Sequence, residues 1–476
     1  TYKATVDDVP VPALQTKRGA FLSFGMDGPV EVTIQLDMIP EDVEIRPLSA
    51  GIKAGVKGSS ITFRLPRPMN LSVEVDGNLR DPLLVFANPA VTDVPDKKDP
   101  KVKFFEAGRI HEAGEITLDD GETLYLEGGA VVRGVVRARG ADHVSVRGPG
   151  ILDAGTRNRK VNMLVLRECR HAVLEDFIIL DPLGWTMHLS GSEDIRISNT
   201  RVIGWRANSD GLDIEYSRKI RVDGCFWRTN DDCIAVKALY PPGVEGIPFE
   251  EMIDPETLGK HRVPRIKGDV VGDIVITNCV LWNDSGGQGF EIGFELRVDE
   301  IRGITFRDCD IIHVRGGGAF TIHNGDRARI EDILLEDIRI EDTDRLMDFH
   351  VGISIYSDDC PAPYRRSNPK RKSPPKEHRP ERANNPHQWY VPAEADLPRF
   401  ENNRGLVRNV VVRNMTVLAP PRRGSILSGY NQSHGISNLT FEGLEIGGKT
   451  ITSAEQADIH LNHVQDLRFL RGPRSR

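Results

Sequence analysis

From about residue 101 onward, a short strand-like pattern recurs along the chain and limits the folds that it can adopt. Each copy holds two apolar residues separated by one position, and it ends two residues later in Asn, Asp or Gly. The uninterrupted steps run 25 to 30 residues, and periods of about 20 to 50 residues are typical of repeat architectures. The copies are Ile195–Asn199, Ile220–Gly224, Ile274–Asn278, Ile304–Asp308, Ile333–Asp337, Val410–Asn414 and Leu439–Gly443.

These repeated strands are short and rich in β-branched residues, which pack well on a pleated surface. Helical periodicity is nearly absent, and this disfavours a TIM barrel. We therefore predict an all-β fold whose main part is a right-handed parallel β-helix. Two steps are longer than the others and predict insertions near residues 239–268 and 357–404. Long loops on a solenoid often rise over its binding face.

The first part of the chain has a different character. Residues 1–98 contain short runs of alternating polarity with turns between them, which predicts an antiparallel β-sandwich. The charged run 94–100 contains two prolines and is typical of a linker. We expect two domains: an N-terminal β-sandwich over 1–98 and a catalytic β-helix over 101–476. The sandwich carries no cluster of catalytic residues, and we expect it to pack against the helix or to guide substrate.

Composition excludes several classes of protein. A net charge of −8 over 476 residues gives no indication of nucleic-acid binding, and no apolar run reaches the roughly 18 residues of a membrane helix. The six cysteines form no CxxC pair, so we expect buried thiols rather than disulfides. A chain that begins at Thr1 is compatible with a trimmed leader. We expect a secreted or periplasmic protein, with a cytoplasmic location and the oligomeric state left open.

Acidic residues precede two of the predicted strands. Asp210 stands before the apolar run 212–214, and Asp231 with Asp232 stands before the run 233–236. Aligning the two runs places Asp210 beside Asp232, 22 residues apart, on neighbouring coils about 4.8 Å from each other. Carboxylates that close cannot all ionise freely, so at least one pKa should be raised. A protonated acid beside ionised bases is what cleavage of a glycosidic bond requires.

Several motifs in and around this region resemble those of the polygalacturonase family of glycoside hydrolases (family 28). The segment 208–211, NSDG, is close to the family's N-T-D-G, and 231–237, DDCIAVK, is close to its D-D-C-I-A-I-K. The segments 120–134, 148–153 and 184–188 match further turns in the same order. The resemblance covers roughly residues 105–330, and a sandwich that precedes a β-helix is also similar to the layout of family 49 dextranases.

The resemblance implies an inverting hydrolase that acts on a polysaccharide or oligosaccharide. It gives Asp231 the role of general acid on the glycosidic oxygen, while Asp210 and Asp232 jointly activate a water molecule. An inverting enzyme separates its acid and base by roughly 6.5–9.5 Å to admit that water. The implied reaction needs no cofactor and no metal.

The chain also departs from the family pattern. The family's G-H-G motif occurs as GQG, with Gln288 in place of the histidine, and its R-I-K motif aligns with Thr321-Ile322-His323. The cations that would hold a galacturonate carboxylate are thus missing, and Arg is favoured there because its fork matches a carboxylate. Glu291 should project outward in the column of Asp213 and Thr321. We expect an acidic, cation-poor cleft that suits a neutral or sparsely charged glycan, with Asp213, Gln288, Glu291 and His323 contacting sugar.

Several of these residues keep two interpretations. Lys237 either neutralises the acidic patch or contacts sugar, and Trp185 is either a stacking platform or a core residue. Glu291 either contacts the substrate or is a solvated surface residue without a function. If Glu291 contacts the substrate, we expect Glu291→Ala to weaken turnover while leaving thermal stability nearly unchanged. The basic run 365–372 is either an exposed loop or a contact for an anionic polymer.

Alternative functions also stay open. The chain could be a true exopolygalacturonase acting on pectin or a dextranase-like enzyme. A polysaccharide lyase would need Ca²⁺ and a basic residue beside the scissile uronate; chelator sensitivity and unsaturated products would identify it. A non-catalytic carbohydrate-binding solenoid would leave the crowded carboxylates without a purpose.

Overall fold

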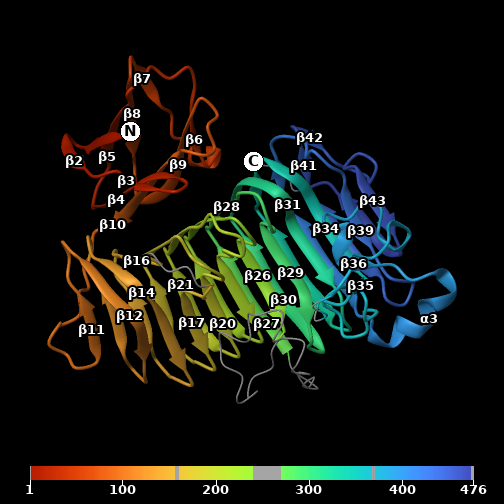
Figure 1. Cartoon of the computed structure of the whole chain (residues 1–476). Coiled ribbons are helices and arrows are strands. Elements are labelled where there is room, and N and C mark those ends of the chain that lie inside the picture. Colours follow the sequence, from red (N-terminus) through yellow and green to blue (C-terminus); the bar gives the residue numbers. More distant parts are fainter. Residues whose placement is uncertain (1, 156–159, 240–269, 367, 369, 473–476) are drawn as a thin grey trace.

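The computed structural model describes residues 2–155, 160–239, 270–366, 368 and 370–472 (Figure 1). Within these residues, strands β1 (Lys3–Val6) to β10 (Leu83–Pro89) form two five-stranded sheets. Apart from one small two-stranded sheet, strands β11 (Val102–Phe105) to β44 (Val464–Leu470) wind into a right-handed parallel β-helix, as the repeat predicted. Its two long sheets contain twelve and twenty of the described strands. Among the described helices, none is long and apolar enough to span a membrane.

The N-terminal sheets pack face to face because their strands alternate in polarity. Strand β5 (Val30–Gln35) buries Val32 and Ile34 in the core of the sandwich and exposes Glu31 and Gln35 on either side of them. Strand β10 is buried on both faces. Leu83, Val85 and Ala87 belong to the core of the sandwich, whereas the alternate residues Leu84 and Phe86 pack on the β-helix. We propose that the boundary between the two domains lies after β10, in residues 90–101.

The stacking of the helix coils follows the predicted register. Leu212 of β23 (Leu212–Glu215) pairs with Ile234 of β26 (Ile234–Ala238). Ile234 in turn pairs with Phe290 of β29 (Phe290–Leu296), and Phe290 pairs with Phe320 of β31 (Asp310–Asn324). All four side chains are buried in the core of the helix. The prediction that they form inward columns is confirmed.

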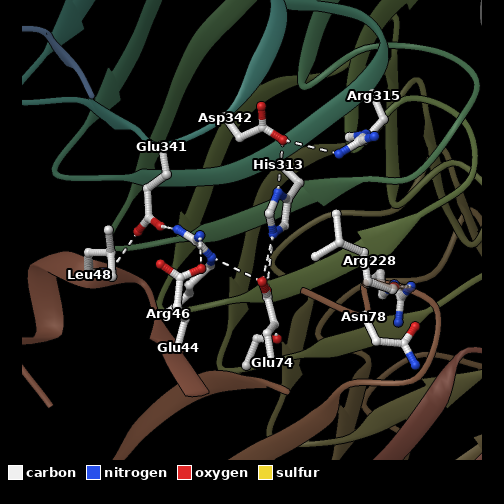
Figure 2. A network of polar contacts seen from close by, with 12 residues as sticks. Glu44, Arg46, Leu48, Glu74, Asn78, Arg228, His313, Arg315, Glu341 and Asp342 are labelled. Atoms are coloured by element: carbon white, nitrogen blue, oxygen red, sulfur yellow. Dashed lines mark hydrogen bonds and ion pairs between the residues drawn. The ribbon is translucent and has the colours of Figure 1, made fainter. Parts of the chain in front are cut away.

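A buried polar junction joins the sandwich to the helix (Figure 2). His313 of β31 lies between two carboxylates, with Nε2 at 3.0 Å from Glu74 of β9 (Met69–Val75) and Nδ1 at 3.2 Å from Asp342. Arg46 of β6 (Val43–Arg46) donates to Glu74 at 3.0 Å and also contacts Glu341. Opposite charges therefore alternate through the junction, across residues far apart in sequence.

Of the two predicted insertions, the one near 239–268 lies almost wholly outside the described residues. The described part of the other, 357–404, contains β36 (Trp389–Tyr390), which pairs with β35 (Ile353–Ser354), and the short helix α3 (Leu397–Phe400). Trp389 is buried, and its ring packs near those of His323 and His350. The insertion therefore covers part of the outer face of the helix.

Candidate active site

The three predicted carboxylates meet at the start of β23 and β26. One oxygen of each of Asp210, Asp231 and Asp232 lies within 4.8 Å of those of the other two. The coils can stack this closely because Gly211 and Gly287 have no side chain: a Cβ on Gly211 would stand 2.4 Å from the Cys233 carbonyl oxygen, and one on Gly287 would stand 2.3 Å from the Asp232 nitrogen. The backbone thus fixes the crowding of the acids.

Crowding and burial raise the pKa of all three carboxyl groups. Burial and the neighbouring Asp213 raise the pKa of Asp210 to about 7, and burial and Asp210 raise the pKa of Asp231 to about 7. Burial and Asp231 hold the pKa of Asp232 well above its usual value. The cluster therefore keeps protons at neutral pH and can offer an acid beside a base.

Within the cluster, Asp231 is the most accessible member. Asp210 is 2% exposed and Asp232 is 8% exposed, whereas Asp231 is only partly buried. The Asp231 carboxylate accepts hydrogen bonds from the backbone nitrogens of Asn208 and Asp232, both at 3.1 Å. These two donors orient a carboxyl group that a ligand can reach.

Lys237 lies beneath the cluster and is buried. Its ammonium stands 2.9 Å from Asp213 and 3.4 Å from Asp210, and 4.2 Å from the centre of the half-buried Trp185 ring. Burial alone would lower the pKa of Lys237, but Asp213 and Asp210 outweigh it and hold that pKa well above its usual value. Burial also raises the pKa of Asp213 to about 7, against the opposing charge of Lys237. These contacts favour a neutralising role for Lys237.

Glu291 and His323 project outward from their strands, as the register predicted, yet both are only 1% exposed. His323 Nδ1 lies 2.9 Å from Glu291 Oε1, and the Thr321 hydroxyl donates to the same carboxylate. Burial alone would lower the pKa of His323, but Glu291 and Asp348 raise it to about 10. The pair is thus a buried carboxylate and imidazolium.

This burial argues against the expectation that Glu291 and His323 line the cleft and contact sugar. The rings of Trp389 and Phe294 cover His323, with ring centres 5.5 and 4.4 Å away. Gln288 is buried too, and its Oε1 accepts a hydrogen bond from the Gly318 nitrogen at 2.6 Å. Removing Glu291 would leave a buried imidazolium short of a partner, so the expectation of unchanged thermal stability no longer holds.

Sequence reasoning missed the cations near the cluster. Lys160 is exposed and donates a hydrogen bond to Asn208 Oδ1 at 2.9 Å, beside Asp231. Arg366, from the basic run, acts electrostatically on Lys160 and on the hydroxyl of the half-buried Tyr356. The cleft is therefore less poor in cations than its motifs indicated. No repeat or motif marks either residue, because each reaches the site from an irregular segment.

Comparisons with known proteins agree with this architecture. The model of glycosyl hydrolases family 28 matches residues 129–252, a segment that contains all three carboxylates. Dex49A from Penicillium minioluteum superimposes with a TM-score of 0.57 at 14% identity, over 98% of this chain and 93% of that one. Its fold therefore extends over both the sandwich and the β-helix.

Two exopolygalacturonases are more distant. The family 28 enzyme of Yersinia enterocolitica has a TM-score of 0.46 at 11% identity, with 97% of each chain covered. The hyperthermoactive enzyme of Thermotoga maritima has a TM-score of 0.45 at 12% identity, over 76% of this chain and 83% of that one. A search of curated protein sequences gives no match. The family match over the carboxylate segment, together with the shared fold, supports a polygalacturonase-like glycosidase, as the motifs predicted.

Proposed function

We propose that the protein is an inverting glycoside hydrolase that cleaves the O-glycosidic bonds of a polysaccharide or oligosaccharide. Asp231 acts as the general acid and protonates the leaving oxygen, because it is the member of the cluster that a ligand can reach. Asp210 and Asp232 activate the attacking water together. The observation that carries this proposal is the convergence of three carboxyl groups with raised pKa values on one partly open spot.

Inversion rests on the family resemblance and not on spacing. The nearest oxygens of the cluster lie within 4.8 Å of one another, closer than the roughly 6.5–9.5 Å between the acid and base of most inverting enzymes. The water would therefore have to bind at the open edge of the Asp210–Asp232 pair. Proton NMR of the first product formed gives its anomeric configuration. Retention would overturn inversion while leaving hydrolysis intact.

We further propose a neutral or sparsely charged glycan as substrate. Thr321 and His323 occupy the positions where the family has two cations, and the His323 imidazolium is buried between Glu291 and Asp348. The buried Lys237 is likewise occupied by carboxylates. Neither cation is free to bind a uronate, and an unpaired buried carboxylate would be costly in such a site.

The test is kcat/KM on polygalacturonate compared with dextran, arabinan and galactan. We expect a neutral glycan to exceed polygalacturonate by roughly tenfold or more, the scale on which a pocket discriminates through a few contacts. Polygalacturonate as the best substrate would overturn the substrate proposal.

Exopolygalacturonase activity is the second candidate function. The presence of two cations near the cluster, Lys160 and Arg366, favours it. Lys160 lies beside Asp231 through its hydrogen bond to Asn208, and Arg366 acts electrostatically on Lys160; a galacturonate carboxylate could bind there. If this candidate holds, Lys160→Met should raise KM for polygalacturonate and leave KM for neutral glycans unchanged. An equal effect on both substrates would argue against a carboxylate contact.

A further inference from the structure

A second group of polar side chains lies on the other long sheet of the helix, apart from the carboxylate cluster. One position, either two residues before or within the first four residues of successive strands in the twelve-stranded sheet, has a positive φ and forms a column. Asn, Asp and Gly fill most of it because they tolerate this conformation best. The described residues of the column are Gly121, His143, His171, Asp194, Lys219, Asp273, Gly303, Asp332, Asn409, Asn438 and Asp466.

Two consecutive coils place histidine at this position. His143 and His171 have φ values of 54° each, so their side chains leave the backbone in the same direction. Neighbouring coils are about 4.8 Å apart, and the two imidazole rings stack accordingly, with centres 4.9 Å apart and planes 19° from parallel. The column therefore holds two imidazoles side by side on the surface.

Asp142 completes a set of three potential metal ligands. One ligand atom each of Asp142, His143 and His171 lies within 4.8 Å of the other two. Two ligands of one zinc ion stand at most about 4.2 Å apart, given bonds of about 2.0–2.1 Å. His143 and His171 are exposed and Asp142 is half-buried, so small side-chain rotations close this gap without moving the backbone.

The neighbouring coil supplies the partner that a metal-binding histidine usually has. His171 Nδ1 lies 2.8 Å from Asp194 Oδ2. When Nδ1 donates its proton to this carboxylate, the Nε2 lone pair is left for a metal, which is the carboxylate–histidine–metal arrangement common in proteins. Asp194 thus acts as a positioning residue for His171.

We propose that Asp142, His143 and His171 bind one divalent transition-metal ion, with zinc as the probe. Two imidazoles and one carboxylate suit zinc, copper or nickel, whereas calcium and magnesium prefer all-oxygen sites. The ion joins two consecutive coils of the folded chain, and a ligand that binds only the folded state raises its stability. The site is separate from the catalytic cluster, so the ion stabilises the helix and takes no part in glycoside cleavage.

The test is calorimetric titration of the purified, chelator-treated full-length protein with zinc, together with its melting temperature. His143→Asn and His171→Asn suit the left-handed turn, so both variants should fold. His463→Asn is the matched control, because His463 also has a φ of 52° but belongs to no potential ligand group among the described residues. Asp231→Asn shows whether zinc binds the carboxylate cluster instead.

We expect one zinc ion per chain in the wild type, and a rise in melting temperature with zinc but not with magnesium. Each of the two histidine variants should lose at least tenfold in zinc affinity, and Asp194→Asn should lose roughly tenfold, as partners of metal-bound histidines typically do. His463→Asn and Asp231→Asn should bind zinc like the wild type. Binding that survives His143→Asn and His171→Asn, or that disappears in Asp231→Asn, would overturn the proposal.

Discussion

Two buried polar clusters of this molecule both contain carboxyl groups but have opposite electrostatics. At the junction between sandwich and helix, His313 and Arg46 alternate with Glu74 and Asp342 (Figure 2). Burial alone would raise the pKa of Glu74, but hydrogen bonds and charge from His313 and Arg46 hold it below its usual value. In the candidate active site, three aspartates face one another, and burial with mutual repulsion raises every pKa.

The difference indicates two uses of buried charge. Alternating charges compensate one another, so the junction is ionised and its role is to hold two domains together. Crowded like charges do not compensate, so the cluster keeps protons that it can transfer, at a cost in stability. Three substitutions and a pH series test this contrast between the two clusters.

The largest effect should come from Asp231→Asn, which removes the proposed general acid. We expect kcat to fall by about a thousandfold or more, the scale lost when proton transfer is removed. The melting temperature should change only modestly, because Asn keeps the shape and can still accept one of the two backbone hydrogen bonds, while it removes one of the crowded acids. Steady-state kinetics with a thermal melt checks both. Turnover near that of the wild type would refute the role of Asp231.

At the junction, Glu74→Gln should destabilise the protein by about 3 kcal/mol while leaving kcat unchanged, because it leaves buried cations without their partner. Glu44→Gln is the matched control. Glu44 pairs with the same Arg46, but its side chain is 44% exposed, so its loss should cost less than about 1 kcal/mol. Chemical denaturation measures both variants. Equal effects would show that the burial of Glu74 does not matter.

The two clusters should also differ in how they respond to pH. Turnover should fall above about pH 7, because the pKa of Asp231 lies near 7 and the general acid is then lost. Asp342 and Glu74 raise the pKa of His313 against the opposing effect of burial. The contribution of His313 to stability is therefore complete below the ordinary histidine pKa and disappears as pH rises through the raised one.

On the acid side, the pKa values of Glu74 and Asp342 are lowered, so their contribution to stability is lost as pH falls through those lowered values. Measuring kcat and the free energy of unfolding over the same pH range compares the response of the aspartate cluster with that of the junction. A turnover that stays constant well above pH 7 would contradict the assignment of Asp231.

The features that could be predicted from the sequence are those that the repeat determines. Alternation with period two and a fixed coil length determine the stacking of Leu212 on Ile234, and the stacking brings Asp210 to Asp232. The burial of His323 could not be predicted, because Trp389 reaches it from an insertion without repeat or alternation. The junction could not be predicted from the sequence either, because His313 and Glu74 are 239 residues apart and no motif contains either residue. The catalytic roles of the aspartates stay predictions.

The smallest expected effect is that of Asp210→Asn on stability, and it tests most directly whether repulsion among the aspartates destabilises the folded protein. Asp210→Asn should stabilise the folded protein at about pH 8 by about 1 kcal/mol, although it should also impair turnover. The wild-type carboxyl group has its pKa raised from 3.8 to about 7 by burial and by Asp213. The folded state therefore loses stability as pH rises from about 4 to about 7 and does not regain it above. Asn carries no charge and avoids this loss, while Lys237 keeps its 2.9 Å contact with Asp213.

Unfolding by denaturant at about pH 4.5 and about pH 8 tests this prediction. The stability gained by Asp210→Asn should be larger at the higher pH, because only there is the wild-type carboxyl group forced to ionise inside the protein. Glu74→Gln should lose stability at about pH 6, because the lowered pKa of Glu74 keeps its carboxylate ionised there in the wild type. A variant at Asp210 that is less stable than the wild type at pH 8 would mean that Lys237 already compensates the cluster, and that its raised pKa values do not reflect strain among like charges.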